Sequence, residues 1–397
     1  MAIEEIPRVK QWLSQFDAAL PDHYLANYLL KKMRFVPFQE VEEWLQKSVE
    51  GLIEDIEKQE GKKVPIAIFP VAKPFINKFN AEKEKKSAND SAGRISHALR
   101  NLERRLPKHV ELTPRDDSMR ARKVKHIIYV DDFIGTGDRF IKSWRNMVSA
   151  RIKSWCSRGW CKIWVLSFAA HKTGINNIAS QIRQVGKSSL KANLVIEKSF
   201  LAENKELVRL ADSYGYKLKK CEVRLGYGKL LSPIIFQHGC PNNVPAIFWS
   251  SGKNGWTPLF PERSVPSELY ALFSFDMSAE TTAEELWMVG HYDLAVSIVN
   301  QIAQYRGDHQ LVMILGFLEK RKDIERIRNV LVLTTKEMCE KLDDLRQHGL
   351  IDSDNKVTNF GLEILKRGKR EAELKQDNND AYNYFYPESF LGFQREV

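Results

Sequence analysis

The segment HIIYVDDFIGTGDRF, residues 126–140, constrains the fold more than any other part of this 397-residue chain. Its apolar run IIYV predicts a buried strand that ends at Asp131 and Asp132, and the loop FIGTG then leads into a helix that begins near Asp138. Strands buried on both faces are typical of parallel sheets, and open α/β sheets bind ligands at the carboxyl ends of such strands. The segment therefore predicts a parallel α/β sheet with a ligand site after Asp132.

The loop after this strand has the residues of a monophosphate site. Gly135 and Gly137 let the backbone approach an anion, Thr136 offers a hydroxyl, and the following helix supplies free amides at its N-terminus. Asp131 and Asp132 lie within reach of ribose hydroxyls or of a Mg²⁺-bound diol. The alternative is an ordinary strand-turn-helix with a solvated acid pair, and the residue pattern favours the phosphate site.

Three further apolar runs predict neighbouring strands of the same sheet. Helical patterns separate the later runs, and alternation of strand and helix is typical of a parallel α/β sheet. The stretch 80–125 is charged and less periodic, which indicates a mobile or partly helical insertion. The three runs are VPIAIF at 64–69, IWVLSFAA at 163–170 and ANLVIE at 192–197.

The 126–140 segment resembles the signature of the type I phosphoribosyltransferases, in which four apolar residues, two acids and two apolar residues precede a small, hydroxyl-rich loop containing Thr-Gly. The resemblance covers about residues 64–200. It implies that Asp131 and Asp132 face the ribose hydroxyls of phosphoribosyl pyrophosphate, with Mg²⁺ as a cofactor held indirectly through the ribose. The residues implied to wrap the 5′-phosphate are Gly135, Thr136, Gly137, Asp138 and Arg139.

Two residues of this loop depart from the family pattern. The family usually has a small or hydroxyl residue where this chain has Arg139, and Asp138 places an anion beside the phosphate pocket. With these departures, the predicted site can be either catalytic or non-catalytic.

The resemblance also implies supporting parts of the site. A pyrophosphate loop follows the first strand, a basic hood lies within 80–125, and a His follows the 163–170 strand. Both Lys73 and His171 have equally good alternatives, as a surface lysine and as a helix-capping residue. The residues concerned are Val71, Ala72 and Lys73 in the loop, and His171 after the strand.

The segment SPIIFQHGCPNNVPAIFWSSGKNGWTPLFPER, residues 232–263, resembles the extended phosphoribosyltransferase-like proteins of bacterial conflict systems, including retron-type defence operons. Its polar and aromatic side chains are candidates for an acceptor pocket in which a base stacks. The alternative is a hydrophobic cluster beneath a long loop. The candidates are His238, Asn242, Asn243, Trp249 and Trp256.

The C-terminal part resembles a winged-helix unit, since three helical patterns precede LID, a turn at Ser353–Asn355 and KVTNFG. Its recognition helix, TKEMCEKLDDLRQH, has four acids against three Lys or Arg, so it would repel phosphates. Its apolar stripe of Met338, Leu342 and Leu345 makes protein contact or dimerisation at least as reasonable as groove reading.

These patterns divide the chain into five parts. They are an N-terminal helical cap at 1–60, a phosphoribosyltransferase-like domain at 61–264, a helical connector at 265–308, a winged-helix-like domain at 309–370 and a tail at 371–397.

The net charge of +10 is concentrated beside the predicted phosphate loop. Residues 83–125 hold 13 Lys or Arg against 6 Asp or Glu, and residues 140–164 hold 6 Lys or Arg and no acid. Such a region attracts a polyanion, and the tryptophans interleaved at 139–160 permit contact with nucleic acid. The alternative, which we favour for 139–160, is that Trp144, Trp155 and Trp160 are buried while the basic side chains reach solvent.

Composition and the N-terminus predict a cytoplasmic protein without a membrane span. No apolar run approaches the roughly 20 residues needed to cross a bilayer, and MAIEEIPRVK is not a secretory signal. The five cysteines lack zinc-site spacing, so we expect reduced thiols and no structural metal.

The leading hypothesis is a Mg²⁺-dependent enzyme that transfers or removes a phosphoribosyl group, or modifies a nucleotide, as an effector of anti-phage defence. One alternative is a catalytically silent phosphoribosyl sensor coupled to a winged-helix interaction or DNA-binding domain. A second is a basic protein that binds nucleic acid or a reverse transcriptase ribonucleoprotein. A homo-oligomer is compatible with all three.

Overall fold

A computed structural model describes residues 3–71, 91–252, 255–274, 282–283, 286–287, 290–292, 294–295 and 309–366. The chain forms two compact units, one comprising Arg34–Phe273 and the other Met1–Met33 together with Ser274–Val397. The first boundary falls inside the predicted N-terminal cap, so the long helix of that cap belongs to the Arg34–Phe273 unit.

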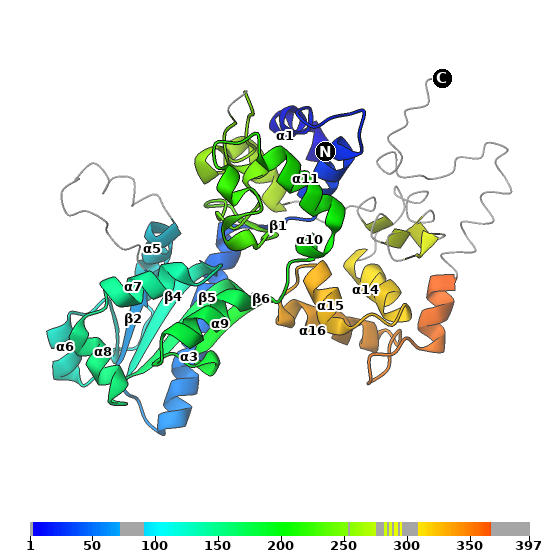
Figure 1. Ribbon diagram of the computed structural model, residues 1–397. Helices are drawn as coiled ribbons and strands as arrows, with labels where there is room; N and C mark the ends of the chain where they lie inside the picture. Colours follow the sequence, from blue (N-terminus) through cyan, green and yellow to red (C-terminus); the bar gives the residue numbers. More distant parts are fainter. Residues whose placement is uncertain are drawn as a thin grey trace, which may run out of the picture. The chain divides into compact units, whose positions relative to one another are not determined.

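The Arg34–Phe273 unit is built on a five-stranded sheet in which every neighbouring pair is parallel (Figure 1). The predicted parallel α/β fold is confirmed, and the central strand β4 is the one that carries the acid pair. In spatial order the strands are β3 (Val110–Leu112), β2 (Ile66–Pro70), β4 (His126–Ile134), β5 (Lys162–His171) and β6 (Leu190–Ile196).

The edge strand β3 is absent from the sequence prediction. It lies inside the charged stretch 80–125 and spans only three residues, which is too short for a period-2 pattern to emerge. Two helices flank β3, so the described part of this stretch is largely helical, in agreement with the predicted partly helical insertion. They are α5 (Ser91–Glu103) and α6 (Asp116–Arg122).

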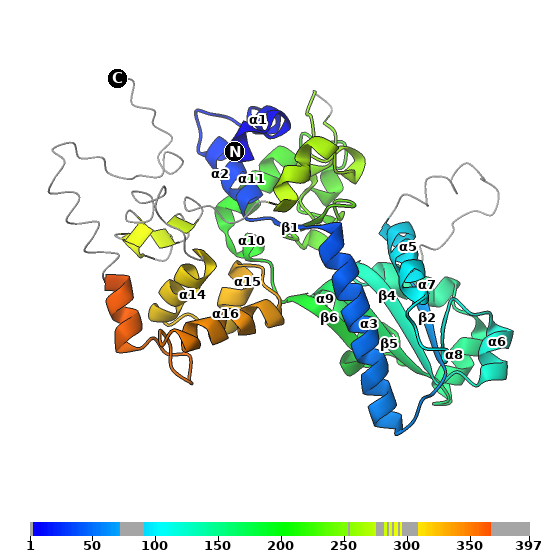
Figure 2. The same cartoon turned by 180° about the vertical axis from the view of Figure 1, so that it is seen from behind.

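Helices cover both faces of the sheet. Helix α3 (Phe38–Glu60) crosses one face with α5 beside it, while α7 (Asp138–Asn146) and α9 (Lys172–Gln181) lie over the other (Figures 1 and 2). Ile127 and Tyr129, two residues apart on β4, both pack into the cluster under α7 and α9. The strand therefore places alternate side chains on opposite faces, as its pleat requires.

The 23-residue helix α3 forms because its apolar residues recur at helical spacing. Their side chains are all buried, and each contributes about 1.5–3 kcal/mol relative to an exposed position. Gly61, with φ of +68°, ends the helix in the left-handed region that glycine enters without strain. The predicted stripe is confirmed at Val41, Leu45, Val49, Leu52, Ile53 and Ile56.

The segment after the sheet folds back toward β4. β1 (Arg34–Val36) pairs in parallel with β7 (Ile234–Phe236), and Phe236 packs edge-on against Phe133 and Phe168 of the main sheet. The chain that follows β7 is thereby carried to the carboxyl end of β4. The remaining elements of this unit are α8 (Ala150–Ser157), α10 (Phe200–Glu203), α11 (Lys205–Gly215) and the short 3-10 helices η2 (Lys187–Ser189), η3 (Cys221–Val223), η4 (Tyr227–Lys229), η5 (Ala246–Phe248) and η6 (Pro261–Arg263).

The second unit contains the predicted winged-helix-like helices. Helices α14, α15 and α16 precede an isolated antiparallel bridge between Ile351 and Val357, and residues 359–366 are helical again. The bounds are η1 (Ile3–Glu5), α1 (Pro7–Leu13), α2 (Asp22–Lys31), α14 (His309–Glu319), α15 (Ile324–Val330) and α16 (Thr335–Gln347); η7 (Ser267–Ser274) spans the boundary between the units.

The apolar stripe of α16 lies in the interior of this unit. Met338, Leu342 and Leu345 are 2%, 5% and 1% exposed and pack in a cluster with Met313. The expectation that this stripe contacts a partner is therefore wrong, because a three-helix unit needs it for its own core. No helix of the described part of the chain is long and apolar enough to span a membrane.

Candidate functional site

A cavity of about 500 Å³ opens at the carboxyl end of β4. One wall is the end of β4, the loop that follows it and the first turn of α7; the other comes from residues 238–243 and 262–264 and from Tyr227. The edge of the sheet where the sequence predicts a ligand site is therefore hollow, and the acid pair and the predicted phosphate loop line the same space.

In the loop Gly135–Gly137, a side chain at either glycine would collide with neighbouring residues. Gly137 has φ of +85°, and a Cβ on it would lie 2.8 Å from the carbonyl oxygen of Gly174. A Cβ on Gly135 would lie 2.3 Å from the side chain of Asn243. The Asn177 amide holds the loop by donating to the Thr136 carbonyl over 3.0 Å. These contacts explain why the loop needs glycine on both sides of Thr136.

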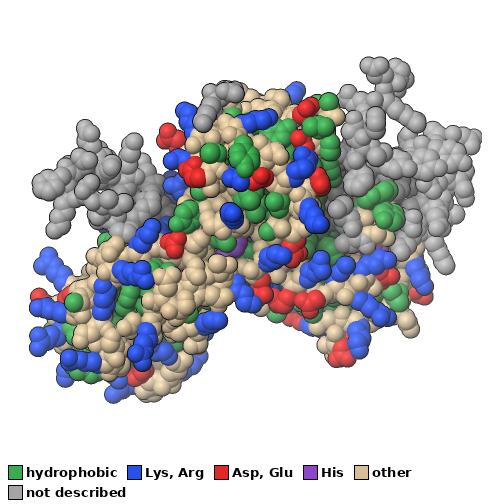
Figure 3. Space-filling model, viewed as in Figure 1, with side chains coloured by type: hydrophobic (Ala, Val, Ile, Leu, Met, Phe, Trp, Pro, Cys, Tyr) green, Lys and Arg blue, Asp and Glu red, His purple; other side chains and the backbone are tan. Residues whose placement is uncertain are grey.

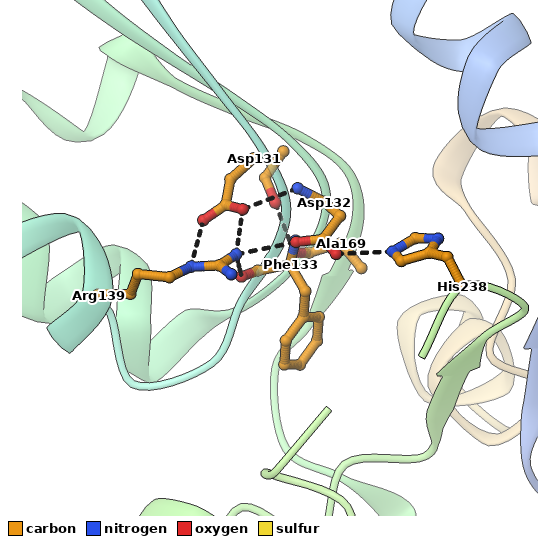
Figure 4. Close-up of polar contacts among 7 residues, drawn as sticks. Asp131, Asp132, Phe133, Arg139, Ala169 and His238 are labelled. Carbon is orange, nitrogen blue, oxygen red and sulfur yellow. Dashed lines mark hydrogen bonds and ion pairs between the residues drawn. The ribbon is translucent and has the colours of Figure 1, made fainter. Parts of the chain in front are cut away.

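The acid pair is buried and bound by Arg139 (Figure 4). Asp131 and Asp132 are each 3% exposed, and Arg139 donates from Nε to Asp131 Oδ2 over 3.1 Å and from Nη2 to Asp132 Oδ1 over 2.8 Å. The same Nη2 also contacts Asp131 Oδ1 and the Phe133 carbonyl. The first turn of α7 thus turns its arginine back onto the strand that precedes it.

All four carboxylate oxygens of the pair accept hydrogen bonds from the protein. Besides Arg139, the Asp132 amide donates to Asp131 Oδ1 and the Phe133 amide to Asp132 Oδ1. His238 donates from Nε2 to Asp132 Oδ2 over 2.8 Å. Ribose hydroxyls that bind here share these oxygens with Arg139 or His238.

Burial and the two cations set the protonation of the pair. Burial raises the pKa of Asp131 above its usual range, although the Arg139 charge opposes the shift. Burial acts on Asp132 too, but the hydrogen bond from His238 and the charge of Arg139 outweigh it and hold the pKa of Asp132 well below its usual range. Asp132 therefore remains ionised, and Asp131 is the group of the pair that takes up a proton first.

His238 is held in place by aromatic rings as well as by Asp132. Its imidazole stacks on Phe236, with ring centroids 5.1 Å apart, and meets Phe38 edge-on at 5.8 Å. Its Nδ1 is buried and has no hydrogen-bond partner within the described ranges. Since His238 follows β7 directly, the pairing of β7 with β1 is what brings it to the acid pair.

Comparison with known families agrees with this architecture. Residues 9–262 match the family model PRTase-CE. The chain belongs to the PRTase-CE family. Residues 312–392 match a second family model, described as wHTH-PRTase associated. No curated protein and no solved structure matches the chain. The resemblance seen in the sequence, to an extended phosphoribosyltransferase-like protein with a winged-helix C-terminus, is confirmed.

Of the predicted acceptor-pocket residues, three line the cavity of the PRTase-CE domain: His238, Asn242 and Asn243. Trp249 and Trp256 lie outside its lining, and each donates its indole N–H to a backbone carbonyl, of Val244 and Ile247 respectively. These two indoles therefore belong to the packing of the segment, which was the alternative considered for them.

His171 also lies outside the cavity lining. It ends β5, is 2% exposed and meets the Phe133 ring edge-on at 5.8 Å. Burial lowers the pKa of His171 to about 4, so the imidazole is neutral at pH 7. Val71 is buried, with its amide bonded to the Val130 carbonyl. Ala72, Lys73 and residues 80–90 of the range predicted for the hood lie outside the described residues.

The PRTase-CE site has features that the sequence did not reveal. Tyr227 donates its hydroxyl to Asp138 Oδ2 over 2.8 Å, and Asn243 donates to the Tyr227 carbonyl over 2.8 Å. The Tyr227 hydroxyl thereby engages the anion that Asp138 places beside the loop and links the second wall to the first, while Asn243 fixes Tyr227. Because Tyr227 and Asp138 are 89 positions apart, no local pattern could have predicted their contact. Lys142 and Arg263 add cations at the cavity wall.

The observed acid pair does not fit direct coordination of Mg²⁺. Mg²⁺ requires oxygen ligands in octahedral geometry, whereas the Arg139 guanidinium already binds both carboxylates. Within the described ranges, no group of three or more His, Cys, Asp or Glu side chains could hold a metal ion. Mg²⁺ that acts here would have to arrive with a phosphorylated ligand.

Proposed function

We propose that this PRTase-CE protein binds phosphoribosyl pyrophosphate or a nucleotide in the cavity at the end of β4. The observation that carries the proposal is that an acid pair, a glycine loop and a helix N-terminus line one cavity. The loop and the first turn of α7 suit a 5′-phosphate, and the carboxylates suit the ribose hydroxyls. About 500 Å³ lies within the range of small-ligand pockets.

In this binding mode we infer that Arg139 exchanges partners. A phosphate on the loop offers the guanidinium oxygens with the same forked geometry as the carboxylates. When Arg139 turns to the phosphate, Asp131 Oδ2 loses its Arg139 donor and Asp132 keeps the hydrogen bond from His238. Asp131 then becomes the principal acceptor for a ribose hydroxyl.

We propose phosphoribosyl transfer or removal as the chemistry, with bond breaking at the anomeric carbon. The ring gains positive charge as its bond to pyrophosphate or to a base breaks, and the ionised Asp132 supplies a fixed negative charge within the site. Most of the acceleration would come from holding the two reactants together.

The test is isothermal titration of the full-length protein with phosphoribosyl pyrophosphate, with and without Mg²⁺. Asp131→Asn with Asp132→Asn should weaken binding at least about tenfold, equivalent to about 1.4 kcal/mol. The matched control is Asp116→Asn with Asp117→Asn, an adjacent pair on α6 that lies outside the cavity lining. Equal binding by the two double variants would remove the proposal. Pyrophosphate release, followed by mass spectrometry with candidate bases and nucleotides, tests the chemistry separately.

A second candidate function is a catalytically silent sensor coupled to the winged-helix unit. The observation that favours it is the acid pair, in which all four oxygens already accept bonds from the protein. A sensor binds phosphoribosyl pyrophosphate without releasing pyrophosphate, and ligand changes amide exchange in residues 309–366. Pyrophosphate release that depends on Asp131 and Asp132 would reject pure sensing.

We further propose a role in bacterial defence against phage, from the resemblance of residues 232–263 to conflict-system proteins. Phage plating on bacteria that carry the protein with its native neighbouring genes measures it. Protection should fall in the Asp131→Asn, Asp132→Asn variant and persist in the Asp116→Asn, Asp117→Asn control.

A further inference from the structure

A basic surface on the PRTase-CE domain takes no part in the proposed phosphoribosyl site except at one end. It is formed by the end of α7, by α8 and by the turn into β5, within the 140–164 stretch that contains no acid. Figure 3 shows Lys and Arg side chains gathered, with few acids among them, over the part of the unit that carries α6, α7 and α8. We call this surface the α7–α8 basic face; its cations are Lys142, Arg145, Arg151, Lys153 and Arg158.

The cations of this face are scarcely neutralised by the protein itself. Only Arg151 pairs with a carboxylate among the described residues, and that pair, with Asp117, is 62% and 90% exposed and therefore weak. Arg145 donates to the Gln181 side chain and Lys153 to the Arg145 carbonyl, both neutral acceptors. Uncompensated like charges held on adjacent elements create a field that attracts a polyanion.

The same face presents an exposed aromatic ring. Trp144 is buried and Trp155 half-buried, as expected, but Trp160 is 59% exposed, so its predicted burial is wrong. The Arg158 guanidinium lies over the Trp160 ring, 5.1 Å from its centroid. Trp160 follows Gly159, a turn residue with φ of +72° between α8 and β5.

We propose that the α7–α8 basic face binds single-stranded nucleic acid. Phosphates of the strand contact the cations, and an unpaired base stacks on Trp160, as aromatic platforms do in proteins that bind single strands. An acidic protein would match the charge, but it would leave the exposed indole without a matching flat partner. Lys142 also lines the cavity, so the face begins at the mouth of the proposed phosphoribosyl site.

Fluorescence anisotropy of the full-length protein with a labelled single-stranded DNA and a labelled single-stranded RNA, over a salt series, tests the proposal. The charge variant is Arg145→Gln, Lys153→Gln and Arg158→Gln, and the stacking variant is Trp160→Ala. The control is Lys219→Gln with Lys220→Gln, two exposed lysines that follow α11. Circular dichroism establishes that each variant is folded.

The charge variant removes three cations that would pair with phosphates, and each such contact contributes about 0.7 to the slope of log affinity against log salt on a single strand. The slope should therefore become shallower by about 2. Trp160→Ala should weaken binding about tenfold, within the range of 1–3 kcal/mol for one stacked base, and leave the salt slope unchanged. Unchanged affinity in both variants, or an equal loss in the lysine control, would overturn the assignment. Equal affinity for poly-glutamate and for the oligonucleotide would identify an acidic protein surface instead. Retained titration of phosphoribosyl pyrophosphate by Trp160→Ala keeps this result separate from the proposed function.

Discussion

Replacing Arg139 by methionine removes the cation that binds both carboxyl groups of the buried acid pair. Met keeps much of the side-chain volume, so the change isolates the charge and the hydrogen bonds. Arg139 is paired with both Asp131 and Asp132, whose side chains are 4% and 5% exposed. Removing one partner of a buried ion pair costs about 3–5 kcal/mol, because the remaining charge is left without compensation. Since Arg139 is itself 25% exposed, we expect the lower end, about 3 kcal/mol.

Urea unfolding followed by tryptophan fluorescence measures this loss, with the midpoint and slope compared between variants because the chain has two units. Arg151→Met is the matched control. Its partner Asp117 is 90% exposed, so its loss should be about 1 kcal/mol or less. If Arg139→Met costs no more than Arg151→Met, the reasoning about the pair is refuted.

Three further predictions concern other parts of the fold. The pKa of His171 is about 4 in the folded protein against 6.5 ordinarily, so the unfolded chain binds the proton first and stability is lost as pH falls from 6.5 toward 4. The loss should be roughly 3 kcal/mol at about 1.4 kcal/mol per pH unit, and His171→Gln should lack it in urea titrations at each pH. Gly174→Ala should weaken ligand binding measured by calorimetry, because its Cβ would lie 2.2 Å from the Gly135 carbonyl oxygen. The control Gly51→Ala in α3 places a Cβ that meets nothing within 4 Å, so it should leave the protein's stability unchanged or raise it by up to about 1 kcal/mol. Thr334→Ala should lower the stability of the second unit by about 1 kcal/mol in hydrogen exchange of α16, because it removes a capping box with Glu337; unchanged exchange would contradict this.

The sequence by itself determined the elements of the fold that depend on local pattern. The four long strands, the stripe of α3 and its stop at Gly61 are visible as periodicity and as a residue suited to positive φ. The acid pair and the glycine loop are also local, because one strand-turn-helix carries them within nine residues, Asp131 to Arg139. The resemblance to phosphoribosyltransferases rested on this segment, and the family match agrees with it.

Only the tertiary structure decided how that segment is occupied. The sequence identified Arg139 as a departure, but whether its side chain meets a phosphate, solvent or the acid pair depends on the path of α7. His238 and Tyr227 reach Asp132 and Asp138 from 106 and 89 residues away. Trp160 is exposed, although Trp144 of the same segment is buried. Such contacts follow from the pairing of β7 with β1 and from packing around each side chain, and a one-dimensional pattern does not encode either. The motif therefore predicted a site, and the fold decided that its carboxylates are bound by the protein's own cations.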